Sequence, residues 1–177
     1  MDQLIQLLRD HPNDPSIPDL INGAEAAADV NLLQQSKQLS GVWELRWSSA
    51  SQPWLKQAPW LDNLQILDPD HSRGLNLLRL NGPLGRFAAI TVEAELSIKT
   101  ATRVSVRFRK GGWVGPEVPG GGRLAWMKTV NQSFPAWLEI TALDDILRIC
   151  RGNAGTTFAL LRRQEMSIDS FLRPEDI

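Results

Sequence analysis

The stretch ITVEAELSIKTATRVSVRFR, residues 90–109, alternates apolar and polar side chains on both sides of a short polar link. Alternation with a period of two predicts two half-buried β-strands, and the link at residues 99–102 predicts a hairpin between them. A turn centred on this link would place Glu93 opposite Arg107 on the outer face. The side chains expected to point inward are Ile90, Val92, Ala94, Leu96, Ile98, Val104, Val106 and Phe108.

Shorter alternating runs extend this sheet along the chain. In GVWELRWSS, residues 41–49, Trp43, Leu45 and Trp47 are predicted to share the inner face. Further strands are predicted over residues 75–80, 124–130, 137–142, 146–151 and 156–161, with breaks at SQPWLKQAPW (51–60) and GGWVGPEVPGGG (111–122). We expect Trp54 and Trp60, on the first break, to lie near the mouth of a barrel. About eight strands with short turns favour a closed up-and-down barrel, which has room for side chains or one small ligand.

The adjacent acids Asp144 and Asp145 predict a turn between two of these strands. If the flanking residues pair symmetrically, Ile140 opposes Ile149, Ala142 opposes Leu147, and Leu138 opposes Arg151. All of these residues then share the inner face, as a common core requires. This register places Arg151 inside the barrel, where an arginine needs a partner, and turns Cys150 away from the pocket.

The amino-terminal region reads as two short amphipathic helices within residues 1–36. Leu4, Ile5, Leu7 and Leu8 recur at helical spacing, and a second helix is predicted over residues 18–35 after a proline-rich break. The barrel is expected over residues 40–163, so that residues 1–163 form one domain of the mainly β, α+β class. Residues 164–177 are predicted to be a polar, loosely held tail.

Composition narrows the classes of function. The chain has 177 residues, a formal net charge of −1 and one cysteine, so it has no global field that would attract nucleic acid and no internal disulfide. No secretory signal and no apolar run long enough to span a bilayer is present, so we expect a soluble or peripheral protein. The two histidines, His11 and His71, have no ligands at metal-site spacing, and no catalytic or phosphate-binding motif occurs. We therefore expect no metal, no cofactor and no catalysis.

Two segments resemble the opening and closing signatures of the plastid-lipid-associated protein (PAP)/fibrillin family. They are LSGVWELRWSS, residues 39–49, and PAWLEITALDDILRICRGNAGTTFALLRR, residues 135–163. The second is the more specific, while residues 50–120 resemble the family only in length and strand rhythm. The chain departs from the family at Ala142, where members commonly have a tyrosine before Leu143 and Asp144.

The resemblance implies a lipocalin-like barrel that associates with lipid globules or photosynthetic membranes. It implies a lipophilic cargo such as a quinone, carotenoid, tocopherol or fatty acid. Because the chain lacks an Arg- and Ser-rich import leader, a cyanobacterial member, cytoplasmic or peripheral to the thylakoid membrane, is favoured over a trimmed plastid chain. The Gly41-Val42-Trp43 triplet also resembles the general lipocalin signature, in which an arginine from late in the barrel covers the tryptophan. We expect Arg151 to cover Trp43, or alternatively to bind a ligand carboxylate.

Three functions remain open from the sequence. The first is non-catalytic carriage of a lipophilic molecule in the barrel. The predicted ligand-binding residues are Trp43, Trp47, Val92, Leu96, Val106, Phe108, Ile140, Ile149, Arg151 and Phe158. The second is a lipocalin-like bilin lyase or chaperone, in which Arg103, Arg107 and Arg109 would hold tetrapyrrole propionates. The third is a structural membrane-coat protein whose barrel is filled by its own side chains.

Overall fold

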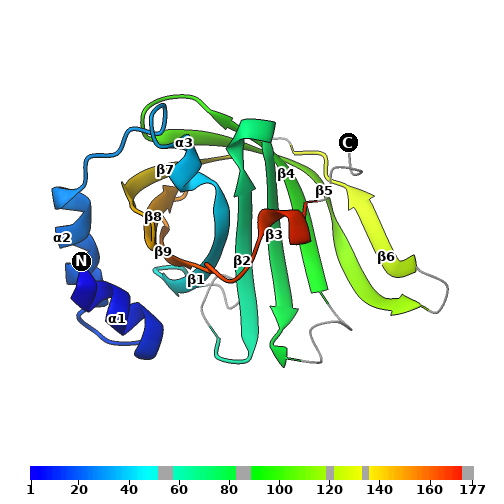
Figure 1. Cartoon of the computed structure of the whole chain (residues 1–177), viewed down its shortest axis with the longest axis horizontal. Helices are drawn as coiled ribbons and strands as arrows, with labels where there is room; N and C mark the ends of the chain where they lie inside the picture. The colour runs from blue at the N-terminus through cyan, green and yellow to red at the C-terminus, as the bar shows by residue number, and fades with distance from the viewer. Residues whose placement is uncertain (52–57, 83–88, 119–121, 133–135, 173–177) are drawn as a thin grey trace.

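The computed structural model describes residues 1–51, 58–82, 89–118, 122–132 and 136–172, in which nine antiparallel strands form one sheet (Figure 1). The strands are β1 (Gly41–Ser48), β2 (Leu61–Asp68), β3 (Arg73–Leu80), β4 (Ala89–Ile98), β5 (Arg103–Val118), β6 (Gly122–Thr129), β7 (Ala136–Leu143), β8 (Leu147–Gly152) and β9 (Thr157–Arg162). The helices are α1 (Asp2–Asp10), α2 (Ile17–Ala27) and α3 (Ser36–Leu39), with short 3₁₀ turns at η2 (Pro69–His71) and η4 (Ile168–Ser170). The prediction at Trp54 lies outside the described residues.

The sheet closes into a barrel. The strand order is β4-β3-β2-β1-β9-β8-β7-β5-β6, and β4 also pairs with β5, so that all strands except β6 form the ring. β6 pairs with the second half of β5 and lies outside the ring, at the right of Figure 1. The predicted class, a mainly β protein with an antiparallel barrel after short amino-terminal helices, is confirmed.

Three apolar clusters hold the strands and helices together. One fills the barrel interior and includes Trp43, Leu96 and Leu160. A second joins α1 and α2 to the outer face of β7, β8, β9 and β1, and both helices lie on that side in Figure 1. A third lies on the outer face of β1, β2 and β3, where Leu172, Phe171 and Ile168 cover it. The residues just after 164 are therefore packed on the sheet, whereas the sequence predicted a loosely held tail.

The second helix is shorter than predicted. It ends at Ala27, and Ala28 is already extended, with φ −82° and ψ 141°. The backbone N–H of Leu32 donates to the carbonyl of Ala101 at 2.7 Å, in the turn between β4 and β5. Leu32 and Leu39 are fully buried in the interior cluster. Val30 and Leu32 thus pack at one end of the barrel instead of continuing a helix, whereas Leu33 is 71% exposed.

Extra residues in three strands shift the register. In β1, Leu45 pairs with Leu160 but Trp47 pairs with Ala159. In β7, Ile140 pairs with Cys150 but Ala142 pairs with Ile149. Each extra residue forms a β-bulge, after which the strand presents the opposite set of side chains to the interior. The predicted Ile140–Ile149, Ala142–Leu147 and Leu138–Arg151 pairs are therefore wrong.

The third bulge is in β5, where Glu93 pairs with Lys110 and Ala94 with Phe108. The predicted pairing of Glu93 with Arg107 is also wrong, because Arg107 lies opposite Glu95. Before this bulge, the pairing of β4 with β5 differs from the predicted pairing by two residues, so the predicted faces are unchanged. Val104, Val106 and Phe108 pack inward, while Arg103, Arg107 and Arg109 are exposed.

Two elements were absent from the sequence prediction. β2 was not anticipated, and the glycine-rich stretch from Gly111 belongs to β5 instead of breaking the sheet. Gly112 suits this strand because a Cβ there would lie 2.0 Å from the carbonyl oxygen of Trp126 on β6. Glycine thus allows the close approach of two backbones that a side chain would prevent.

Candidate functional site

The ten predicted ligand-binding residues divide between the two faces of the barrel wall. Trp43, Leu96, Val106, Phe108, Ile140 and Phe158 belong to the interior cluster. Val92 is half-buried on β4, in the same alternating set as Leu96. Trp47 and Ile149 lie instead in the outer cluster beneath α1 and α2. The bulges in β1 and β7 account for both errors, and they also place Cys150 inside the barrel, where the sequence had turned it outward.

Arg151 lies outside the barrel and does not cover Trp43. Its Nε and Nη2 donate to the two carboxylate oxygens of Glu25 on α2, at 3.0 and 2.5 Å. The Thr141 hydroxyl donates to the same carboxylate at 2.7 Å. Burial raises the pKa of Glu25, but these hydrogen bonds outweigh burial and hold the pKa below its usual value. Arg151 therefore ties α2 to the barrel, beside an outer groove of about 320 Å³.

The tryptophan of the Gly41-Val42-Trp43 triplet is covered by another arginine, Arg162 at the end of β9. The Arg162 Cζ lies 4.3 Å from the Trp43 ring centroid, and the Trp43 indole N–H donates to the Leu39 carbonyl at 2.9 Å. Arg162 also donates to the carbonyls of Ser40 and Asp145, at 2.6 and 2.8 Å. The predicted arrangement of a late arginine over an early tryptophan is present, but the predicted residue was wrong.

Gly41 is required by this arrangement. Its φ of +149° is rarely adopted by residues with a side chain, and a Cβ at this position would lie 2.1 Å from Nη1 of Arg162. Arg162, Trp43 and α3 therefore close one end of the barrel together with Leu32. We call this set of residues the closed end.

A second arginine, Arg148 on β8, is buried inside the closed end with no exposed surface. Its Cζ lies 5.1 Å from the Trp43 ring centroid, and its Nη2 donates to Oε1 of Gln65 on β2. Nε and Nη1 of Arg148 have no hydrogen-bond partner among the described residues. Burial lowers the pKa of Arg148, and the positive charge of Arg162 lowers it further, while Cys150 acts in the opposite direction. The resulting pKa is about 10, so the side chain remains a cation at neutral pH.

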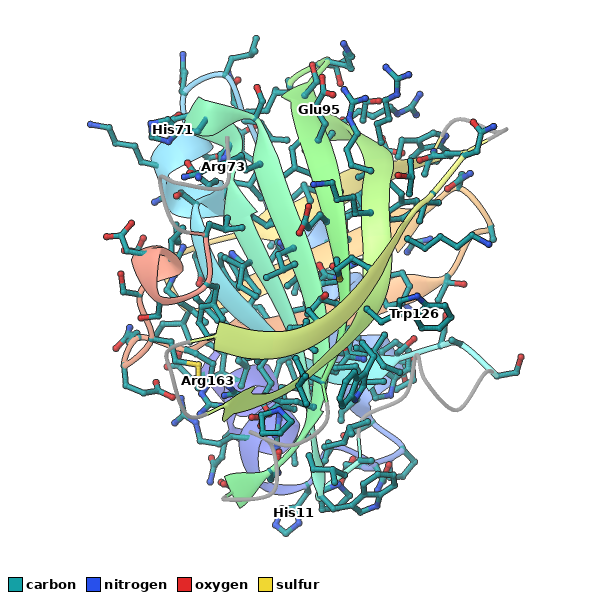
Figure 2. The ribbon with its side chains drawn as sticks, turned by 90° about the vertical axis from the view of Figure 1, so that its right-hand side faces the viewer. His11, His71, Arg73, Glu95, Trp126 and Arg163 are labelled. Carbon is teal, nitrogen blue, oxygen red and sulfur yellow. The ribbon has the colours of Figure 1, made fainter. Side chains whose placement is uncertain are left out.

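The opposite end of the inner face is exposed. The register places Leu78, Ile90, Trp113 and Trp126 side by side on β3, β4, β5 and β6. Ile90 is on the same alternating face of β4 as the buried Leu96. Yet Ile90 is 54% exposed, Trp113 37% and Trp126 75%. We call these four residues the open face; Figure 2 labels Trp126 on β6.

The open face exists because β5 changes partners along its length. Residues 103–106 of β5 pair with β7, whereas Lys110 and the residues after it pair with β6. Between the two pairings, the Gln132 side chain bonds the β5 backbone by accepting from the N–H of Phe108 at 2.6 Å and donating to the carbonyl of Val106 at 3.3 Å. The barrel wall is thus continuous around the closed end, while β6 leads the sheet outward at the open face.

Sequence reasoning missed the tryptophans and arginines that distinguish these ends. Trp113 was hidden in a stretch read as a break, and Trp126 was not assigned to a face. Arg148 and Arg162 alternate with apolar residues in β8 and β9, a pattern typical of outward arginines. The triplet at Gly41 was the available signal for Arg162, since it predicts an arginine late in the barrel. No pattern in the sequence singled out Arg148.

Candidate metal-binding clusters and candidate membrane-spanning helices are both absent from the part of the chain that the structure describes. Among them, no group of three His, Cys, Asp or Glu residues is placed to hold a metal ion. In the same residues, helices lack the length and apolar character needed to cross a membrane. Arg103 and Arg109, predicted as tetrapyrrole contacts in the lyase hypothesis, form ion pairs with Glu139 and Glu95.

Comparison with known proteins adds one match. A family model described as PAP_fibrillin matches residues 9–161, from the last two residues of α1 to the penultimate residue of β9. Neither the curated proteins nor the solved structures contain a match to the chain.

Proposed function

The chain belongs to the PAP/fibrillin family, and from this premise we propose that it binds a lipophilic small molecule on the inner face of its barrel. The ligand classes under consideration are quinones, carotenoids, tocopherols and fatty acids. In this proposal the protein carries its ligand without changing it chemically. The ligand enters over the open face and extends toward the interior residues Phe108, Phe158 and Val106.

The observation that carries the proposal is the exposure of the open face. Leu78, Ile90, Trp113 and Trp126 continue the apolar inner surface beyond the point where the barrel is packed. Contiguous exposed apolar surface on a protein commonly marks a binding site. Burying such surface against a ligand contributes about 25 cal/mol per Å² before the cost of immobilising the ligand is subtracted.

The open face also supports contact with a membrane during ligand exchange. Leu124, 49% exposed, and Trp126 project from β6, which lies outside the barrel ring. Lys128 is exposed two residues after Trp126 and so lies on the same side of the strand. Tryptophan favours the interface between lipid and water, and lysine favours anionic headgroups. We propose peripheral contact with a lipid surface through this part of β6.

Tryptophan quenching tests the proposed ligand site. Delipidated protein is titrated with a short-chain quinone and with a nitroxide-labelled fatty acid while intrinsic fluorescence is recorded. Both ligands should quench the fluorescence, and the quenched fraction should fall in Trp113→Phe and Trp126→Phe. Trp137→Phe is the matched control, because Trp137 packs on the outer face with Arg103 at 4.3 Å. If no lipophile quenches the wild type and none is extracted from natively purified protein, the proposal is wrong.

A further inference from the structure

We infer that Arg148 and Gln65 form the polar end of the ligand site and select a lipophile with a carboxylate head group. This inference rests on the proposed function and names the class of ligand that the barrel would prefer. Arg148 projects from β8 and Gln65 from β2, two strands separated in the sheet by β9 and β1, so the pair meets across the interior. Neither residue was in the predicted site.

Arg148 has unpaired N–H groups although it is fully buried, and unpaired polar groups in a protein interior are destabilising. A guanidinium has five N–H donors, and the described residues bond only Nη2 of Arg148, through Gln65. Nε and Nη1 are both unpaired, and Nη2 has a second N–H beyond the one that bonds Gln65. Each two-donor edge of a guanidinium combines Nη2 with either Nε or Nη1, because Cδ lies between Nε and Nη1. Adjacent N–H groups of this kind match the two oxygens of a carboxylate. One such edge, formed by the second Nη2 N–H and either Nε or Nη1, is therefore left free to bind a carboxylate bidentately.

The charge of the closed end points to an anion instead of a neutral acceptor. Arg148 forms no ion pair with a described carboxylate, and its neighbour Arg162 adds a second positive charge against the same Trp43 ring. A buried charge without a counter-charge destabilises the folded state. A ligand carboxylate would supply that counter-charge.

The structural role of covering Trp43 does not require Arg148. Arg162 already lies closer to the Trp43 ring, at 4.3 Å against 5.1 Å, and is fixed by hydrogen bonds to backbone carbonyls. Arg148 bonds one neutral side chain and is enclosed by leucines, with Leu160 and Leu143 as its strand partners. Replacing a buried ionic group by an apolar one of similar volume is often neutral or stabilising. The presence of Arg148 is therefore better explained by binding than by folding.

The path to Arg148 is apolar. Leu160 and Phe158 alternate along β9 in the interior cluster, between Arg148 and the exposed part of the inner face. A hydrocarbon tail would lie along these side chains while the carboxylate reaches the guanidinium. Because Arg148 is fully buried without ligand, the leucine side chains around it must change rotamer on binding.

Three ligands of one chain length test this inference. Palmitic acid, hexadecanol and methyl palmitate are titrated at pH 8, below their aggregation concentrations, into delipidated wild type by calorimetry. Wild type should bind the acid roughly 10- to 100-fold more tightly than the alcohol or the ester. Arg148→Met should lose this preference while its affinity for the alcohol stays within about twofold. Arg107→Met, which removes an exposed cation from β5, should retain the preference.

The outcomes distinguish a failure of the proposed function from a failure of the inference about Arg148. If none of the three ligands binds the wild type, the proposed function fails and this inference fails with it. If wild type binds the acid and the alcohol equally, or if Arg148→Met keeps the preference for the acid, only this inference is overturned. The unfolding transition of delipidated Arg148→Met should be unchanged or raised. A marked fall would assign Arg148 a structural role and overturn its assignment as the anchor.

Discussion

The two ends of the inner barrel face differ in how completely the chain itself covers them. At the closed end, Trp43 and Leu39 are fully buried, and α1 and α2 cover the outer side of the same strands. At the open face, Trp113 and Trp126 continue the same sheet but remain partly or largely exposed. One sheet therefore combines a packed region, which supplies stability, with an uncovered apolar region available for binding. The two regions should respond differently to mutation.

The largest difference is expected from removing one tryptophan at each end. Trp43→Ala removes a fully buried ring that packs against Arg162, and should lower the free energy of unfolding by about 3–5 kcal/mol. Trp126→Ala removes a ring that is 75% exposed and should change it by at most about 0.5 kcal/mol. Urea denaturation followed by circular dichroism measures both. Equal effects would show that the two ends do not differ as described.

The next effect concerns the glycine beneath Arg162. Gly41→Ala introduces a Cβ into the space of the guanidinium at an unfavourable φ, and should destabilise the protein by about 1–3 kcal/mol. Gly23→Ala is the control, because it lies in α2 with no atom within 4 Å of the added Cβ. That change should be neutral or stabilising by up to about 1 kcal/mol. If both variants melt at the wild-type temperature, Arg162 does not need the space at Gly41.

A smaller effect is expected at the Glu25–Arg151 ion pair, which ties α2 to β8. The folded pKa of Glu25 is lowered, so its stabilisation is present at neutral pH and is lost as pH falls through the folded pKa. Glu25→Gln should therefore be less stable than wild type at pH 7, by about 1 kcal/mol. The difference should begin to shrink as the pH falls below the ordinary glutamate pKa of 4.5, and it should disappear once the pH is well below the folded pKa. Thermal melts across this pH range test the prediction, and a difference that persists at low pH contradicts it.

The smallest effect on stability is expected from the exposed side chains of β6. The same changes should clearly weaken binding to lipid vesicles. Trp126→Ala combined with Lys128→Ala should leave the melting temperature within about 2 °C of the wild type, because both side chains are exposed. The double variant should bind vesicles containing anionic lipid several-fold more weakly in a flotation assay. Arg107→Ala together with Trp60→Ala is a control away from β6. Undiminished vesicle binding by the double variant would exclude β6 as the contact.

The sequence predicts the fold well where alternation is uninterrupted and poorly where a bulge resets it. Residues 90–98 and 103–108 were assigned to the correct faces because the bulge in their ladder adds its extra residue after Phe108, so alternation within each run is uninterrupted. Trp47 was assigned to the wrong face because Trp43, Leu45 and Trp47 alternate perfectly in the sequence, while the strand gains one residue at Arg46. Such a bulge forms where the closing barrel bends β1, and bending depends on strands distant in the chain. The alternation of residues within β1 therefore cannot predict this bulge.

β2 was not predicted from the sequence, and the physical reason is different. Its outward residues, Leu64 and Ile66, are buried under the carboxy-terminal segment, whereas its inward set includes the polar Gln65. The usual rule that apolar residues face the interior is therefore partly reversed in this strand. The same reversal hid Arg148, because a basic residue between apolar ones ordinarily faces solvent. The part of the interior that we propose for binding is thus the part where the general pattern does not hold.

The pairing of β1 with β9 has a consequence for how the protein is made. These strands join residues 41–48 to residues 157–162, and Arg162 bonds the carbonyl of Ser40, 122 positions earlier. During translation, α1, α2 and the first strands leave the ribosome long before their partners on β7, β8 and β9 exist. Contacts of such sequence separation slow folding and prolong the exposure of apolar surface. The nascent chain should therefore depend on chaperones until its last strand has been synthesised.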